Sequence, residues 1–313
     1  MLECRFPENT HQKDIMEHIH DRLFILGDRN MPSFLLIGDT KRALIDAGAA
    51  YFGPKYLDDL TLILGDDLRV DYLFFTHSHF DHIGAAPFLM RRVANLTPAA
   101  HPYLFTVLIR DGAKKTIGRL NRVGCAEAVA SGELHEADFD YGIIRPGLQL
   151  SDNDVIDLGG LTIRVVATPG HTGDSLSYYV ERTGEVFTGE AAGIIPGEEL
   201  YVGPEFLSSY RDYMNSLEKI RALKPTTIYT GHHTRVESRD LDRFFQAAIR
   251  DTRNLREKIE RYLLETGMDE ATVVNRIKEE EYHDLRKSRQ MEEAYVLNLT
   301  AQVRHIAGLI GND

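Results

Sequence analysis

YLFFTHSHFDH, residues 72–82, is the stretch from which the fold and most of the chemistry can be inferred. Its first four residues form an apolar run of strand length, and three histidines and an aspartate follow directly. His77 and His79 are two residues apart, so their side chains point the same way in an extended segment. Asp81 and His82 come where we expect the chain to turn into a helix, which would allow them to bind a second ion. Imidazole and carboxylate groups suit zinc, iron or manganese.

Two distant histidines repeat this arrangement. His171 lies in TPGHT at residues 168–172, after the apolar run Leu161–Val166, and His232 lies in TGHH at residues 230–233, after Thr227–Tyr229. In each case an apolar run is followed by a glycine turn and a histidine. One histidine after a strand is usually a surface residue, but three strand ends that all supply metal-ligand residue types are not expected by accident. The sequence therefore predicts a metal site at one edge of a sheet.

The chain up to about residue 235 predicts a layered α/β protein, because short apolar runs alternate with longer periodic stretches. Examples of the predicted strands are Leu23–Leu26, Phe34–Ile37, Ala43–Ile45, Tyr72–Phe75, Leu161–Val166, Ser175–Val180, Val186–Thr188 and Thr227–Tyr229. The predicted helices are Pro54–Leu64, Pro87–Leu96, Leu207–Leu223 and part of 105–135.

The pattern of apolar and charged residues changes after residue 238. From Leu241 onwards apolar residues recur on one helical face with charges opposite. Gly267 is expected to end this helix, and Asp269 is placed to begin another. We interpret 1–238 as the catalytic domain and 239–313 as an all-helical region packed on it, which is also a candidate homodimer interface.

Composition excludes several classes of protein. The formal net charge of −12 argues against a general nucleic-acid binder, which needs clustered Lys and Arg. The two cysteines, Cys4 and Cys125, are far apart and predict no disulfide framework. The polar N-terminus is unlike a signal peptide, and no apolar run approaches the roughly 18 residues of a membrane span. We therefore expect a cytoplasmic protein that acts on a small molecule and binds neither nucleic acid nor a membrane.

Four motifs resemble those of the metallo-β-lactamase superfamily over roughly residues 20–235: HSHFDH at 77–82, PGHTGDS at 169–175, TGE at 188–190 and GH at 231–232. The resemblance implies a four-layer αβ/βα sandwich with the site at one end of the two sheets. It implies that His77, His79 and His171 hold one divalent metal ion, and that Asp81, His82 and His232 hold the other. In layout the chain is most similar to the 2-aminobenzoylacetyl-CoA thioesterases of quinolone signalling and to the glyoxalase II-like branch.

The chain departs from the family pattern at Glu190, where relatives usually have a bridging aspartate. Three interpretations are open: a bridging glutamate, a ligand to one ion, or a residue that does not ligate and leaves a weakened site. Because Glu190 follows the predicted strand Val186–Thr188, we expect it to coordinate metal.

The resemblance and the ligand set together predict a metal-dependent hydrolase. Two divalent ions, with zinc favoured over iron or manganese, generate a hydroxide near neutral pH. Asp81 and His82 are the candidate catalytic residues, with Asp81 orienting the hydroxide. We expect an acyl thioester as the substrate, because a thiolate leaves without strong acid assistance. The alternatives are a lactone or other ester hydrolase, and a non-catalytic metal-binding regulatory protein in which Glu190 has compromised the site.

Two further features have weaker signals. Arg110, Lys114, Lys115, Arg119 and Arg122 lie on one partly helical stretch, where they could meet the phosphates of a CoA-type substrate or form a solvated helix face. Tyr201 follows the TGE motif and is either a hydrogen-bond donor to the substrate or an ordinary packed residue.

Overall fold

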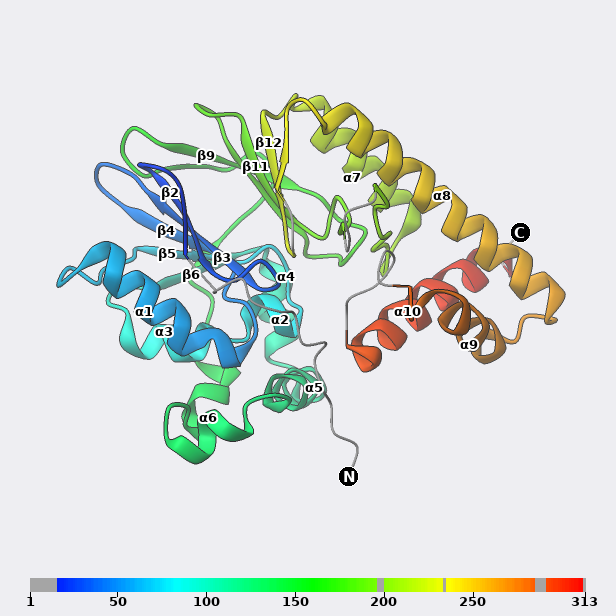
Figure 1. The fold of residues 1–313 in the computed structure, drawn as a ribbon, viewed down its shortest axis with the longest axis horizontal. Helices are drawn as coiled ribbons and strands as arrows, with labels where there is room; N and C mark the ends of the chain where they lie inside the picture. The colour runs from blue at the N-terminus through cyan, green and yellow to red at the C-terminus, as the bar shows by residue number, and fades with distance from the viewer. Residues whose placement is uncertain (1–15, 196–199, 233–234, 285–290, 312–313) are drawn as a thin grey trace.

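A computed structural model describes residues 16–195, 200–232, 235–284 and 291–311 of the chain. Two β-sheets pack face to face and helices cover their outer faces, which gives the four layers expected from the sequence (Figure 1). The first sheet has seven strands in sequence order, antiparallel from β1 to β4 and parallel from β4 to β7. These are β1 (Glu17–His20), β2 (Leu23–Gly27), β3 (Pro32–Ile37), β4 (Arg42–Ile45), β5 (Tyr72–Phe74), β6 (Thr97–Ala100) and β7 (Leu148–Gln149).

The second sheet has six strands in the order β13-β12-β11-β10-β9-β8. All neighbours are antiparallel except β11 and β12, which are parallel and therefore end at the same edge. The strands are β8 (Val155–Asp157), β9 (Thr162–Ala167), β10 (Leu176–Val180), β11 (Glu185–Gly189), β12 (Thr227–Thr230) and β13 (Arg235–Glu237).

Alternating side chains bury both faces of each sheet. In β3, Leu35 points to the helical layer, whereas its neighbours Phe34 and Leu36 point to the other sheet. Between the sheets, the Phe34 ring lies 4.9 Å from that of Phe187 and 5.5 Å from that of Tyr229. A strand that is buried on both faces has a continuous run of apolar residues. This signal is the reason that the central strands were predicted correctly from the sequence.

Helices complete the outer layers. The first sheet is covered by a layer of α1 (Gly53–Leu64), α3 (Ala86–Arg92), α4 (Pro102–Leu108) and α5 (Asp111–Arg122), with the short α2 (Phe80–Ile83) and the 3-10 helices η1 (Ala50–Phe52), η2 (Glu136–Phe139) and η3 (Tyr141–Ile143). The helix α6 (Ala126–Ser131) has no buried residue and lies at the edge of this layer. The second sheet is covered by α7 (Tyr210–Ala222) and α8 (Leu241–Glu265).

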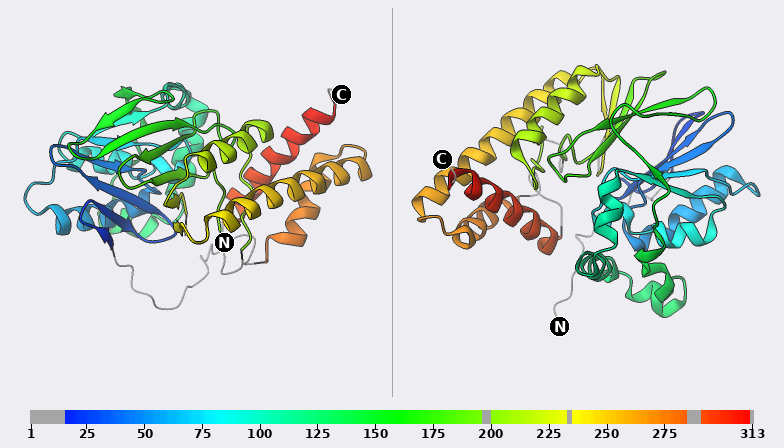
Figure 2. Two further views of the ribbon diagram at one scale, coloured as in Figure 1. Left: turned by 90° about the horizontal axis from the view of Figure 1, so that it is seen from above. Right: turned by 180° about the vertical axis from the view of Figure 1, so that it is seen from behind.

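The C-terminal region is helical throughout its described residues. After α8 come α9 (Glu270–Glu281) and α10 (Glu292–Ile310), which lie together at one side of the sandwich (Figure 2). Between α8 and α9, Gly267 adopts φ +64°, and the Asp269 side chain caps α9 by accepting from the Ala271 and Thr272 amides. One apolar cluster runs from Ile228 in the sheet through α8 to Ile306 in α10. The division at 238/239 into two domains stays a prediction.

No helix in the described parts of the chain has the length and apolar character that crossing a membrane requires.

Candidate metal centre

The strand ends bring all seven predicted metal-site residues together. His77, His79, Asp81 and His82 follow β5, His171 lies between β9 and β10, Glu190 follows β11 directly, and His232 follows β12. Two glycines make this approach feasible. A Cβ at Gly170, whose φ is +131°, would lie 2.2 Å from the Tyr213 amide nitrogen. A Cβ at Gly231 would lie 2.3 Å from Oε1 of Glu190, so only glycine leaves space for that carboxylate.

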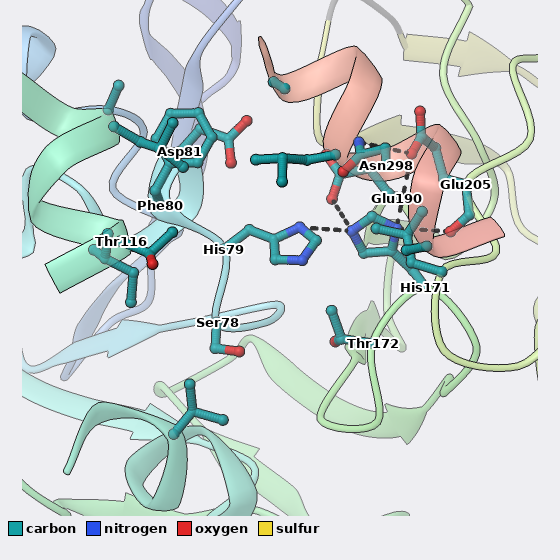
Figure 3. Close-up of a pocket in the computed structure, with 18 of the residues that line it drawn as sticks. Ser78, His79, Phe80, Asp81, Thr116, His171, Thr172, Glu190, Glu205 and Asn298 are labelled. Carbon is teal, nitrogen blue, oxygen red and sulfur yellow. Dashed lines mark hydrogen bonds and ion pairs between the residues drawn. The ribbon is translucent and has the colours of Figure 1, made fainter. Parts of the chain in front are cut away.

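The side-chain nitrogens of the first cluster, His77, His79 and His171, converge on one point. Nε2 of His171 lies 3.2 Å from Nε2 of His77 and 3.0 Å from Nδ1 of His79. Figure 3 shows the rings of His79 and His171 facing one another.

The second cluster consists of Asp81, His82 and His232, whose ligand atoms all lie within 4.8 Å of one another. Nε2 of His232 is 3.4 Å from Oδ2 of Asp81. His82 and His77 are fully buried, whereas Asp81 and His232 are half-buried and face the cavity described below.

Glu190 lies between the two clusters, and its two oxygens face different ones. Oε2 lies 3.2 Å from Nε2 of His77 and 3.6 Å from Nε2 of His171. Oε1 lies 2.9 Å from Nε2 of His82 and 3.0 Å from Nε2 of His232. Of the interpretations that the sequence left open, a bridging position is the one that this geometry favours.

The donor set fits divalent metal ions. Ligands arranged tetrahedrally at zinc distances are separated by about 3.3 Å, close to the 3.0–3.2 Å between the nitrogens of the first cluster. Buried imidazole nitrogens at such distances repel one another through their lone pairs unless a proton or a cation lies between them. In addition, Oε2 of Glu190 is buried and accepts no hydrogen bond from the described residues, although buried oxygens are normally paired.

The second ring nitrogen of each of four histidines is held by a fixed partner. Nδ1 of His82 contacts Oδ2 of Asp46 at 2.8 Å, and Nδ1 of His77 contacts Oγ1 of Thr76 at 3.0 Å. The His171 and His232 rings donate through Nδ1 to backbone carbonyls, of Glu205 at 2.7 Å and of Asn30 at 2.5 Å. Such contacts orient a metal-binding ring and fix its tautomer.

Sequence reasoning missed these partners. Asp46 follows the strand Arg42–Ile45 directly, so the rule that found the histidines, a polar ligand type after an apolar strand, could have found it. The carbonyls of Asn30 and Glu205 carry no such signal, because every residue has one. Asp174 was also missed: it is buried near His79 at the cavity wall, and neither of its carboxylate oxygens has a hydrogen-bond partner among the described residues.

The pKa values of the histidines shift in opposite directions in the two clusters. Burial lowers the pKa of His77 well below its ordinary value and lowers the pKa of His171 to about 3, so both rings are neutral at physiological pH and can offer lone pairs. At His232 burial also lowers the pKa, but hydrogen bonds to Asp81 and Glu190 outweigh it and raise the pKa to about 10. A cation can take the place of that proton, since metal binding displaces protons from its ligands.

A cavity of about 660 Å³ opens from the clusters towards α5 and α10. His79, Asp81, His171 and Glu190 line one end of it (Figure 3). His232 lines the same cavity. The described residue Tyr201 does not line this cavity. On the outside of α5, Lys114 pairs with Asp111 at 3.1 Å and Arg122 with Glu136 at 2.8 Å, which favours the interpretation of the basic stretch as a solvated helix face.

Comparison with known proteins gives a consistent result. The family model of the metallo-beta-lactamase superfamily matches residues 26–232. The chain is 26% identical over 274 residues to the Beta-lactamase-like protein 2 homolog of Caenorhabditis elegans, covering 84% of this chain and 79% of that protein. It is 26% identical over 254 residues to the hydroxyacylglutathione hydrolase of Pelagibacter ubique, covering 79% of this chain and 84% of that protein. The crystal structure of a metallo-beta-lactamase family protein from Thermus thermophilus superposes with a TM-score of 0.58 at 18% identity, over 92% of this chain and 89% of that one, which shows the shared fold.

Proposed function

This chain belongs to the metallo-beta-lactamase superfamily, and we propose that it is a dinuclear metal-dependent hydrolase of acyl thioesters. The observation that carries the proposal is the position of Glu190, whose two carboxylate oxygens face two separate groups of imidazole and carboxylate donors. Under the proposal, one ion is held by His77, His79 and His171, the other by Asp81, His82 and His232, and Glu190 bridges them. Zinc is the first candidate, because it accepts both ligand types in this geometry, and iron or manganese share the ligand preference.

Two divalent ions bound here supply a hydroxide nucleophile at neutral pH and positive charge for the developing oxyanion. The chain's own residues provide its orientation. The Asp81 carboxylate lines the cavity beside His232, where it can accept a hydrogen bond from the nucleophile. His82 is held by Asp46 through Nδ1, which turns Nε2 towards the site. Burial of the donors excludes water and strengthens their interaction with the reacting charge.

A thioester suits this site better than an ester. A thiol has a pKa of about 8.5, so the thiolate leaves without a strong acid at hand. The similarity to a hydroxyacylglutathione hydrolase supports the same substrate class. A lactone or ester hydrolase needs a proton for a more basic leaving oxygen.

The test is thiol release from a panel of acyl-CoA thioesters and S-lactoylglutathione by metal-replete protein. We expect release that is lost on chelation and restored by added metal. His79→Ala and Asp81→Ala are expected to lose turnover by at least a hundredfold and to bind less metal. The control is His18→Ala, which removes an exposed histidine of β1 and should leave both metal content and turnover unchanged.

The outcomes separate the alternatives. Hydrolysis of lactones or oxygen esters, with no thiol released from any member of the panel, would replace the thioester proposal. Absence of turnover with both ions bound would favour a non-catalytic metal-binding protein.

A further inference from the structure

The cavity that begins at the candidate metal centre extends between helices α5 and α10. These helices come from distant parts of the chain (Figure 1), and residues of both line the cavity. An ion pair between Arg119 of α5 and Glu293 of α10 joins them directly. The candidate metal centre therefore lies at one end of this cavity, and the two helices form walls at the other end.

Each helix presents an apolar stripe to this space. Ala113, Ile117 and Leu120 line it from α5, and Ala294, Leu297 and Ala301 line it from α10. The spacing of three and four residues places each set on one helical face. Leu297 is 47% exposed and Tyr103, at the start of α4, is 42% exposed, although both line the cavity. Large apolar side chains left uncovered around a cavity indicate a site for an apolar ligand.

We propose that this space holds the aliphatic chain of the acyl group, so that the enzyme selects acyl thioesters of medium to long chain length. The inference rests on the proposed function and specifies its substrate. The scissile carbonyl lies at the end lined by His79 and Asp81, and the hydrocarbon tail extends between α5 and α10. A short polar acyl group such as lactoyl would leave the apolar walls in contact with water. Each methylene moved from water to these walls should strengthen binding roughly fourfold.

One polar pair interrupts the apolar wall. The Glu205 carboxyl group lines the cavity and accepts from Nδ2 of Asn298 on α10 at 3.4 Å (Figure 3).

The direct test measures binding of the free acids acetate, butyrate, octanoate and dodecanoate to metal-replete protein by isothermal titration calorimetry. Every acid in this series has the same carboxylate, so the contribution of carboxylate–metal binding cancels when the Kd values are compared. We expect Kd to fall at least tenfold from butyrate to octanoate, with a negative heat-capacity change for the longer acids. Equal Kd values along the series would overturn the inference, whether or not the protein hydrolyses thioesters.

A cavity-filling variant locates the binding. In Ala301→Phe the new ring occupies the space between the helices, so the affinity for dodecanoate should fall at least tenfold while that for acetate stays within twofold. For acyl-CoA substrates, kcat/KM should shift towards short chains in the same way. Ala130→Phe is the matched control, because Ala130 is an exposed residue of α6 outside the cavity. If Ala301→Phe does not fold, Leu297→Ser tests the same wall at a more exposed position and should also weaken dodecanoate selectively.

The results distinguish this inference from the proposed function. Chain-length-dependent binding without thiol release would support the apolar site and contradict the proposed thioesterase activity. Chelator-sensitive thiol release with the same kcat/KM for acetyl-CoA and dodecanoyl-CoA would support the thioesterase activity and contradict the acyl-chain site. An unchanged chain-length profile in both Ala301→Phe and Leu297→Ser would place the acyl group elsewhere.

Discussion

The Glu190 carboxylate reaches both ligand clusters, and Gly231 leaves room for it. Its oxygens lie 3.2 Å from Nε2 of His77 and 2.9 Å from Nε2 of His82. A neutral amide in the same place keeps the shape but offers only one oxygen and no charge. Glu190→Gln should therefore bind about one metal ion per chain or fewer, and lose at least a hundredfold in kcat/KM.

Metal content by elemental analysis and turnover check this prediction on the same samples. Glu181→Gln, a change at a half-exposed glutamate that pairs with Arg164, serves as control. Two ions and normal turnover in Glu190→Gln would show that the residue does not bridge the clusters.

Asp46 supports the site from behind His82. Its carboxylate accepts from the Thr76 amide and from the Thr76 hydroxyl, each at 2.8 Å, and from Nδ1 of His82 at 2.8 Å. Its φ is +59°, a conformation that asparagine also tolerates. Asp46→Asn thus removes one acceptor and the charge without straining the backbone.

Because a buried donor is then left unpaired, we expect Asp46→Asn to lose about 1–3 kcal/mol of unfolding free energy. Loss of the contact that orients His82 should weaken metal binding or turnover by roughly tenfold to a hundredfold. Urea unfolding and metal titration measure the two effects. A variant that loses stability but keeps full metal affinity would make Asp46 a purely structural residue.

At the scale of the elements, sequence patterns found the central strands and the boundary between α8 and α9, because burial and capping leave local signals. They did not predict where α9 ends or where α10 begins. They missed β1, β6, β7, β8 and β13. β7 has two residues and β8 and β13 have three each, which is too few to show an alternating pattern. The sequence of β6 is TPAA, and proline and alanine are depleted in strands. The histidines that the structure brings together at the candidate site are those that the motifs predicted. The cavity was not, since it forms between α5 and α10, which meet only through tertiary packing.

Helix α10 also supports the loop that orients His171. Nε2 of the buried Gln302 donates to the Pro204 carbonyl at 2.6 Å, next to the Glu205 carbonyl that His171 contacts. Gln302→Leu leaves the Pro204 carbonyl unpaired, which should cost about 1–3 kcal/mol. We expect a lower melting temperature and a reduced metal affinity. Leu309→Gln, at an exposed position of the same helix, should change neither.

The His305 ring of α10 accepts from the Tyr210 amide at 2.9 Å and links α10 to the start of α7. Burial lowers the pKa of His305 below 6.5, with Asp212 opposing and Arg256 reinforcing the shift. Between pH 6.5 and the lower pKa of the folded state, His305 therefore takes up a proton in the unfolded chain but not in the folded chain. The free energy of unfolding should fall as the pH drops through this range. His305→Gln keeps an acceptor without titrating, so its unfolding free energy should fall less between pH 7.5 and pH 5.5. Parallel pH profiles of variant and wild type would contradict this.

At the scale of the whole molecule, the helical region and the second sheet share one apolar core. Phe244 and Phe245 of α8 belong to the same cluster as Val186 and Ile228 of the sheet, and Val303 of α10 joins it from the far side. The C-terminal helices thus cover the sheet and also form one wall of the cavity. That they mediate dimerisation as well stays a prediction.

This shared core decides what removing residues 239–313 should do. Each large apolar side chain taken from the core costs about 1.5–3 kcal/mol, and α8 alone contributes Leu241, Phe244, Phe245, Ile259 and Leu263. The total is comparable with the 5–15 kcal/mol that stabilises a typical protein. We expect a chain that ends at residue 238 to aggregate, or to bind a hydrophobic dye and unfold without a cooperative transition. A chain that ends at residue 284 keeps α8 and α9, so it should stay folded with a lower melting temperature and lose its selectivity for long acyl chains. If the 238-residue chain were monomeric and melted cooperatively near the melting temperature of the full-length chain, residues 239–313 would be an independent domain. The cavity wall that α10 forms would then not be needed for the rest of the chain to fold.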